Sequence, residues 1–280
     1  MYRLACLLAL ALLPVIAAAN TPCRYSADRN FDVPASGLAT VAIDLGSNDV
    51  VVEGVDGLAN VEIRGHACAS DQSWLDGLTV DQRTAGDTLT ITPHSGHDVH
   101  INWFGENYAY VRLHVRAPSK LAARIRGDSG DAEVNRVAAL DFETSSGDLL
   151  ANHIPGTVGI EVSSGDAQGE DLGIVDVRSA SSGDITLGDV HGPIDVARVG
   201  SGDLRFHRVG SVRVGSVGSG DVSVSDAGGD VSVDSIGSGD VDVDGVAGAF
   251  HVGSKGSGDV HYRNVRGQVS VPHDADGDDD

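Results

Sequence analysis

The residues best placed to do chemistry are aspartates that follow serine and glycine at a near-constant interval. The tripeptide Ser-Gly-Asp occurs eight times, and its glycines lie 17 to 19 residues apart. Repeated carboxylates of this kind can bind cations or hydrogen-bond the amides of tight turns. Gly and Asp are adjacent and occur once per interval, unlike the Gly-Gly-x-Gly-x-Asp repeat of calcium-binding β-rolls. We therefore expect turn chemistry, with weak cation association left open, from Asp131, Asp148, Asp166, Asp184, Asp203, Asp221, Asp240 and Asp259.

The segment from 94 to 110 holds two further candidates. Its histidine run has ligands that suit zinc or copper, but we expect no helix to hold that spacing and favour a polar loop. Its aromatic residues could stack on a sugar, although capping the end of a narrow core is the favoured interpretation. The two sets are His94, His97 and His100 with Asp98, and Trp103, Phe104, Tyr108 and Tyr110.

No enzyme motif accompanies these residues. The sequence lacks a G-x-S-x-G elbow, an H-E-x-x-H pair, a phosphate-binding loop and a free cysteine with a plausible histidine partner. We predict no catalytic residue, no cofactor and no specific metal site. A polysaccharide-acting β-helix is the enzymatic alternative, because many exported solenoids act on glycans.

The elements that must position the aspartates are short strands. Counted from the glycine of each tripeptide, apolar residues recur at +2, +4, +7, +11 and +13, as in Val222, Val224, Ala227, Val231 and Val233. This pattern predicts two alternating strands per unit. A second glycine at +9 is expected to turn the chain between them. The fixed period predicts an all-β solenoid, a parallel β-helix with 18 to 19 residues per coil.

Stacked coils would bring the eight aspartates into a column at one corner. Neighbouring carboxylates would then repel, and we expect each to be stabilised locally by amides of its own turn. The segment Gly46-Ser47-Asn48-Asp49 resembles a degraded first copy, in which Asn48 replaces glycine because it tolerates a positive φ. The region before the repeats is expected to cap the stack.

Four segments follow from these patterns. Residues 1–19 have the charged start, apolar stretch and small-residue end of a signal peptide. Residues 20–118 form an irregular, β-rich start of the solenoid, residues 119–272 its regular part, and residues 273–280 an acidic disordered tail. Cleavage would leave Cys23 and Cys68 in an exported protein, where a disulfide between them is expected.

The composition limits the partners. With a net charge of −22, the chain lacks the basic face that nucleic acids or anionic membranes require. Acidity keeps a strand-rich protein soluble and discourages pairing between exposed strand edges. No membrane-spanning segment is expected after signal cleavage.

The recurring S-G-D-[V/I/L]-x-V unit, with glycine at +9 and the entry Val115 to Leu121, resembles the bacterial putative-adhesin family of β-strand-repeat domains, which is close to auto-transporter adhesin heads. The resemblance covers roughly Gly37 to Pro272. It implies an exported, single-chain β-solenoid of right-handed sense, and it carries over no catalytic residue.

The function expected from the sequence is a non-enzymatic, adhesin-like surface at the cell envelope, in the periplasm or outside the cell. Its ligand, a glycan or an envelope protein, and its oligomeric state are left open. A periplasmic structural or envelope-stress accessory protein is the alternative. The outward positions expected to form the surface are Ser223, Ser232, Asp242, His261 and Ser270.

Overall fold

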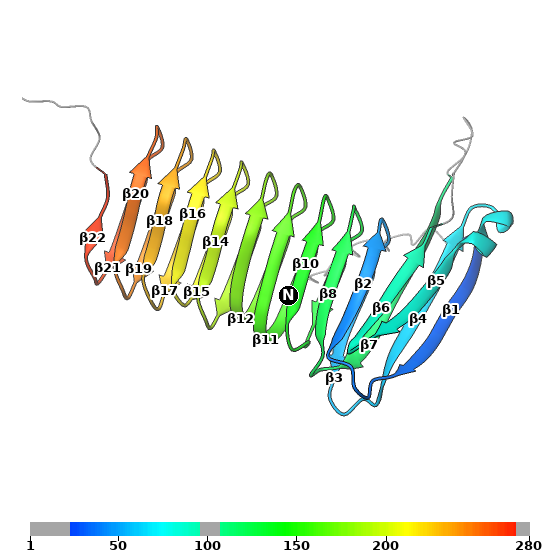
Figure 1. Cartoon of the computed structure of the whole chain (residues 1–280). Coiled ribbons are helices and arrows are strands. Elements are labelled where there is room, and N and C mark those ends of the chain that lie inside the picture. Colours follow the sequence, from blue (N-terminus) through cyan, green and yellow to red (C-terminus); the bar gives the residue numbers. More distant parts are fainter. Residues whose placement is uncertain (1–22, 96–106, 273–280) are drawn as a thin grey trace, which may run out of the picture.

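The computed structural model describes residues 23–95 and 107–272. The expected signal peptide, the acidic tail, and His97, Asp98, His100, Trp103 and Phe104 lie outside the described residues. In the described ranges the chain is an all-β solenoid, which confirms the fold class (Figure 1).

The strands fall into an irregular beginning and a regular continuation. The beginning comprises β1 (Tyr25–Pro34), β2 (Thr40–Gly46), β3 (Val50–Val55), β4 (Asn60–Ala69), the 3₁₀ helix η1 (Gln72–Gly77), β5 (Thr79–Ala85), β6 (Thr88–His94) and β7 (Ala109–Pro118). The expected boundary at residue 118 falls at the end of β7. The continuation comprises β8 (Ala122–Gly127), β9 (Ala132–Asn135), β10 (Leu140–Thr144), β11 (Leu149–Val162), β12 (Ala167–Ala180), β13 (Ile185–Val190), β14 (Ile194–Val199), β15 (Leu204–Val209), β16 (Val212–Val217), β17 (Val222–Ala227), β18 (Val231–Ile236), β19 (Val241–Val246), β20 (Phe250–Lys255), β21 (Val260–Val265) and β22 (Val269–Ser270).

Successive coils pair in parallel, one period apart. In one sheet β13 pairs with β15, β15 with β17, and β17 with β19, so that Ile185, Leu204, Val222 and Val241 form one row. In the other sheet β14, β16, β18 and β20 follow the same rule. The long strands β11 and β12 contribute to both sheets. Each coil therefore adds one strand to each of two facing sheets.

The core lies between these sheets and is built from the predicted apolar positions. Val222, Val224, Ala227, Val231 and Val233 are all buried, which confirms their inward placement. The sequence interpretation missed a sixth inward position, three residues before the tripeptide glycine, which Ile236 occupies in this coil. In the last coil the ring of Tyr262 is 48% exposed and lies 5.9 Å from that of Phe250.

The order of coils in space differs from their order in the chain. The β2–β3 coil lies between β6–β7 on one side and β8–β9 on the other (Figure 1). Beyond β6 and β7 the pairing becomes antiparallel: β5 closes one sheet, and β4 followed by β1 closes the other. We call β1, β4, η1 and β5 the cap. It terminates the parallel stack, as the sequence analysis expected of the N-terminal region.

Candidate functional site

The eight repeat aspartates form a ladder along one corner of the solenoid. The Oδ1 atom of each accepts a hydrogen bond from the backbone N–H of the next aspartate, as in Asp166 to Asp184 at 2.9 Å and Asp240 to Asp259 at 2.8 Å. The same bond recurs at 2.8–3.3 Å for the remaining pairs, beginning at Asp49. We name this column, Asp49 included, the aspartate ladder.

The expectation of local bonds within each turn was wrong, because every one of these bonds joins two coils. The backbone N–H of each repeat aspartate directly follows the glycine turn, where the main-chain hydrogen bonds between coils are interrupted. These bonds resume one residue later, as in the bond from Val222 N–H to the Asp240 carbonyl at 2.8 Å. The carboxylate of the preceding coil supplies the missing acceptor. Aspartate is thus needed at this position to satisfy a backbone donor.

The tripeptide glycines are required by close approach between coils. A Cβ at Gly202 would clash with the carbonyl oxygen of Gly183, and the same relation links Gly220 to Gly202 and Gly239 to Gly220. None of these glycines has a positive φ. The +9 glycines lie in the turns between the two strands of a unit, as expected, and they too come close to the preceding coil without a positive φ; they are Gly192, Gly229, Gly248 and Gly267.

Asn48 takes the glycine position in the first copy of the turn, but not for the reason expected. Its φ is not positive. Its buried side chain accepts a hydrogen bond from Val111 N–H at 2.9 Å and donates to the Leu45 carbonyl at 3.0 Å. The side chain therefore supplies the acceptor for the Val111 N–H at the start of the column, which glycine could not do.

A second column, which the sequence interpretation missed, lies six residues after each tripeptide glycine. Here the backbone is left-handed, with φ between 49° and 76°, although only one member is glycine. The left-handed residue bends the strand so that +4 and +7 both face the core. The members are Arg136, His153, Asp171, Asp189, Arg208, Asp226, Gly245 and Asn264. The recurrence of Asp and Asn at this fixed interval could have indicated the left-handed position, because both residues tolerate a positive φ.

Ion pairs neutralise the aspartate ladder unevenly. Arg205 contacts both Asp184, at 3.2 Å, and Asp203, at 2.7 Å. The Asp203 N–H, helped by the Arg205 guanidinium, lowers the pKa of the Asp184 carboxyl. Arg112 lies 3.9 Å from Asp49. Between these two arginines, no described cation lies within ion-pair distance of the ladder carboxylates Asp131, Asp148 and Asp166.

A groove of about 370 Å³ runs beside this unneutralised part of the ladder. One side is formed by the ladder carboxylates from Asp49 to Asp166. The other is formed by the outward row Val51, Glu133, Leu150 and Gln168, which are consecutive partners in the sheet. Val51 is 37% exposed and Leu150 41% exposed, and they are two of the four large apolar residues exposed in the described ranges. We call this feature the ladder groove.

A larger depression of about 790 Å³ lies over the ends of β2, β8, β10 and β11, on the other sheet. Its lining is polar and includes Asp44, Arg126, Glu143 and Glu161. The Arg126 Nε already donates to Glu143 at 2.9 Å, and Glu161 accepts from Arg178 at 2.9 Å. Because Arg126 already pairs with Glu143 and Glu161 with Arg178, we assign this depression no ligand.

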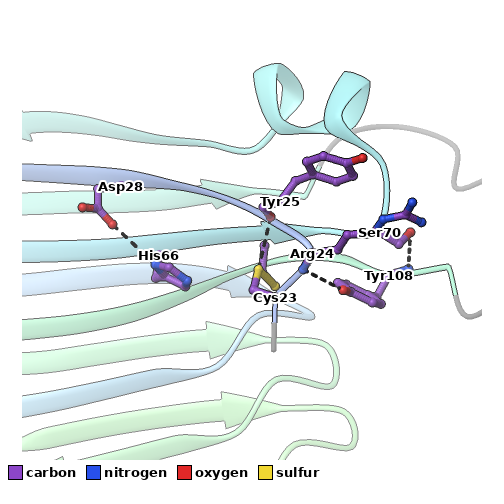
Figure 2. The surroundings of a disulfide bond; sticks show 8 residues. Cys23, Arg24, Tyr25, Asp28, His66, Ser70 and Tyr108 are labelled. Atoms are coloured by element: carbon purple, nitrogen blue, oxygen red, sulfur yellow. Dashed lines mark hydrogen bonds and ion pairs between the residues drawn. A yellow bond between two sulfur atoms is a disulfide. The ribbon is translucent and has the colours of Figure 1, made fainter. Parts of the chain in front are cut away.

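The cap is fastened by a disulfide between Cys23 and Cys68, whose Cα atoms are 5.6 Å apart (Figure 2). Near it, Arg24 N–H donates to the Tyr108 hydroxyl at 3.1 Å, and Tyr108 N–H donates to Ser70 Oγ at 3.2 Å. The rings of Tyr108 and Tyr110 are 6.1 Å apart. The described half of the aromatic cluster thus belongs to the cap end, while His94 pairs with Asp81 at 3.1 Å.

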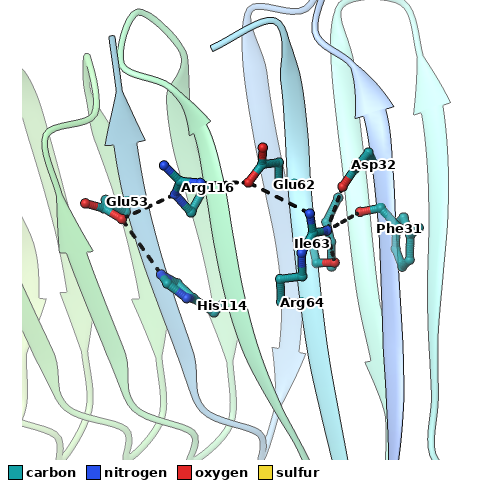
Figure 3. A network of polar contacts seen from close by, with 8 residues as sticks. All are labelled: Phe31, Asp32, Glu53, Glu62, Ile63, Arg64, His114 and Arg116. Carbon is teal, nitrogen blue, oxygen red and sulfur yellow. Dashed lines mark hydrogen bonds and ion pairs between the residues drawn. The ribbon is translucent and has the colours of Figure 1, made fainter.

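Alternating charges connect the cap to the parallel strands (Figure 3). Asp32 on β1 pairs with Arg64 on β4 at 2.6 Å, and Glu62 on β4 pairs with Arg116 on β7 at 2.8 Å. Arg116 also approaches Glu53 on β3 at 3.6 Å. These partly exposed pairs cross four adjacent strands and fix their register more than they add stability.

No cluster of three or more His, Cys, Asp or Glu side chains in the described ranges has the geometry to hold a metal ion. No helix in those ranges has the length and apolar character of a membrane span.

Fold and site define a class: a capped β-solenoid with one ladder of turn carboxylates. No protein-family model matches the sequence, and no curated protein does. Among solved structures, it is similar to a putative adhesin from Parabacteroides merdae ATCC 43184, with a TM-score of 0.52 and 12% identity over 84% of this chain and 96% of that one. A putative adhesin from Bacteroides fragilis NCTC 9343 has a TM-score of 0.47 and 14% identity over 86% and 99%.

A third structure, a putative lipid binding protein from Parabacteroides distasonis ATCC 8503, has a TM-score of 0.40 and 14% identity over 88% of this chain and 97% of that one. The likeness to the Parabacteroides merdae protein shows a shared fold. The resemblance to adhesin-named β-solenoids is therefore confirmed at the level of fold.

Proposed function

We propose that the mature protein is an exported, non-enzymatic β-solenoid that presents a binding surface at the cell envelope in an adhesin-like role. The observation that carries the proposal is the contrast between inward and outward rows. Inward rows are apolar apart from Thr144, whereas the outward row beside the aspartate ladder continues from Gln168 through Thr186, Arg205, Ser223 and Asp242 to His261. A rigid frame with varied outward side chains suits recognition of a partner.

Two further observations support export and binding. The disulfide between Cys23 and Cys68 is typical of proteins from oxidising compartments. A solved structure with the same fold, from Parabacteroides merdae, is named a putative adhesin. The compartment we propose is the periplasm or the cell surface.

The test is retention of the purified mature chain on whole cells and on glycan arrays. Two matched variants locate the surface: Ser223→Arg on one sheet and Ser232→Arg on the other. These outward serines lie in neighbouring strands of the same coil. We expect retention by the wild type and loss in one variant. Absence of retention on every cell and array would end the adhesive proposal.

Fractionation with surface protease treatment distinguishes the envelope-accessory role. A protein that is fully protected in intact cells, and released when the outer envelope is opened, would favour a periplasmic partner. Turnover of an acidic polysaccharide by the wild type would instead support the enzymatic alternative.

A further inference from the structure

The ladder groove combines two features that occur together nowhere else along the aspartate ladder. Its acidic side has three consecutive carboxylates, Asp131, Asp148 and Asp166, without an ion pair to any described cation. Its other side carries the exposed aliphatic side chains of Val51 and Leu150. The groove therefore has one negative side and one mixed side, on which Val51 and Leu150 alternate with the polar residues Glu133 and Gln168.

The same ladder provides an internal comparison. At Asp184 and Asp203 the outward row carries Arg205, which already neutralises both carboxylates. At Asp221, Asp240 and Asp259 the outward neighbours are polar, namely Ser223, Asp242 and His261. Only the stretch from Asp131 to Asp166 combines ladder carboxylates that lack an ion pair to a described cation with nearby exposed aliphatic side chains.

We propose that the ladder groove binds an extended segment of a partner protein in which basic and aliphatic residues alternate. Adjacent side chains of an extended chain point to opposite sides. A segment lying in the groove would thus direct lysines or arginines toward the carboxylates and aliphatic side chains toward Leu150 and Val51. This inference rests on the proposed function and names the partner class for one surface.

The energetics favour this occupant over a purely cationic one. Stacked carboxylates about 5 Å apart repel by roughly 1 to 3 kcal/mol per pair, depending on the local dielectric, and a partner cation relieves that repulsion. Exposed ion pairs alone contribute little, however, and are weakened by salt. Burial of Leu150 against an aliphatic side chain adds a contribution that salt does not screen.

The test uses fluorescence anisotropy of the mature protein with a synthetic peptide of alternating lysine and leucine at physiological salt. A lysine–serine peptide of the same length measures the contribution of charge alone. We expect the lysine–leucine peptide to bind at least tenfold more tightly. Equal affinity for the two peptides, or no binding at millimolar protein, would overturn the proposal.

Matched variants locate the binding to the groove. The triple change Asp131→Asn, Asp148→Asn and Asp166→Asn keeps a side-chain oxygen for each inter-coil hydrogen bond but removes the charge. We expect it to weaken binding tenfold or more, whereas the same change at Asp221, Asp240 and Asp259 should weaken it less than twofold. An equal effect of both triples would show general attraction to an acidic protein.

Leu150→Ser should weaken binding of the lysine–leucine peptide about fivefold, and Ile174→Ser should not. Ile174 is 46% exposed and lies outside the groove lining. Equal effects of these two serines would contradict the proposal. If the peptide does not bind but the protein is still retained on cells, the ladder groove is not the binding site. The proposed function would then depend on another face of the solenoid.

Discussion

The cap and the regular coils both satisfy the exposed edge of a neighbouring strand, but they do so with different kinds of contact. The coils repeat one set of contacts at every level: the aspartate ladder, the tripeptide glycines and six inward apolar positions. The cap relies on contacts that occur once, namely the disulfide, antiparallel pairing of β1 with β4 and of β5 with β6, and the charges of Figure 3. The coils thus depend on uniformity, and the cap depends on individual residues.

The largest loss of stability should come from disrupting one of the contacts that recur in every coil. Gly202→Ala places a Cβ against the Gly183 carbonyl, which cannot move without separating two coils. We expect a loss of about 3 kcal/mol or more in unfolding free energy, measured by urea denaturation. The control is Gly228→Ala, where the nearest atom, the Val209 carbonyl oxygen, is 3.6 Å from the added Cβ and φ is not positive. Similar losses in both variants would refute the close-approach explanation.

Removal of the disulfide should affect the cap selectively. Loop entropy gives roughly 4 kcal/mol for closing a loop of this length. In the double variant Cys23→Ser, Cys68→Ser we expect faster amide exchange in β1 and β4, with the coils from β13 to β20 nearly unchanged. Hydrogen exchange read by mass spectrometry measures both regions in one sample. Uniform loss of protection along the chain would show that cap and coils unfold together.

A single step of the aspartate ladder should contribute less. Asp240→Ala leaves the Asp259 N–H without its acceptor, and we expect a loss of about 1 kcal/mol because water can reach this corner. Asp240→Asn keeps an acceptor oxygen and removes one repelling charge, so thermal stability should stay level or rise slightly. If Asn were as destabilising as Ala, the ladder would depend on charge rather than on hydrogen bonding.

The smallest expected effect is on the stability of the protein at low pH. The pKa of Asp184 is lowered in the folded state by the Asp203 N–H and by Arg205, so its contribution to stability is present above its unfolded value of about 3.9. That contribution is lost as pH falls through the lower folded value. Arg205→Gln should lower the urea midpoint slightly at pH 7, and the midpoints of the two proteins should converge as the pH falls below 4, so that the decline in acid is flatter in the variant. Parallel pH curves for the two proteins would contradict this assignment.

The sequence predicted the structural features that recur in every coil, but few of the contacts that occur only once. The period and the apolar positions predicted the solenoid and most inward residues, because every coil repeats the same pattern. The left-handed column escaped notice because its residue types vary, and Arg136 and Arg208 are not residues that favour a positive φ. Their conformation is imposed by the coil, which must bury both +4 and +7.

The ladder groove could not be predicted for a different reason. Val51 on β3 and Leu150 on β11 are far apart in the sequence but have only β9 between them in space, and the placement of β3 beside β9 brings them together. The repeat pattern gives no information on that placement, because β2–β3 would fit equally well before any coil. The sequence also could not show that the aspartate hydrogen bonds join neighbouring coils, because a bond within one turn would use the same residue types.

The insertion of β2–β3 between later strands has a consequence for the order of assembly. In a chain that emerges N-terminus first, one face of this coil stays uncovered until β6 and β7 have emerged, and the other until β8 and β9 have emerged. Every subsequent coil, by contrast, finds a completed template on which to dock. Vectorial growth can therefore begin only after a long-range closure involving residues up to 135, and shortened chains that stop before that point should remain unstructured throughout.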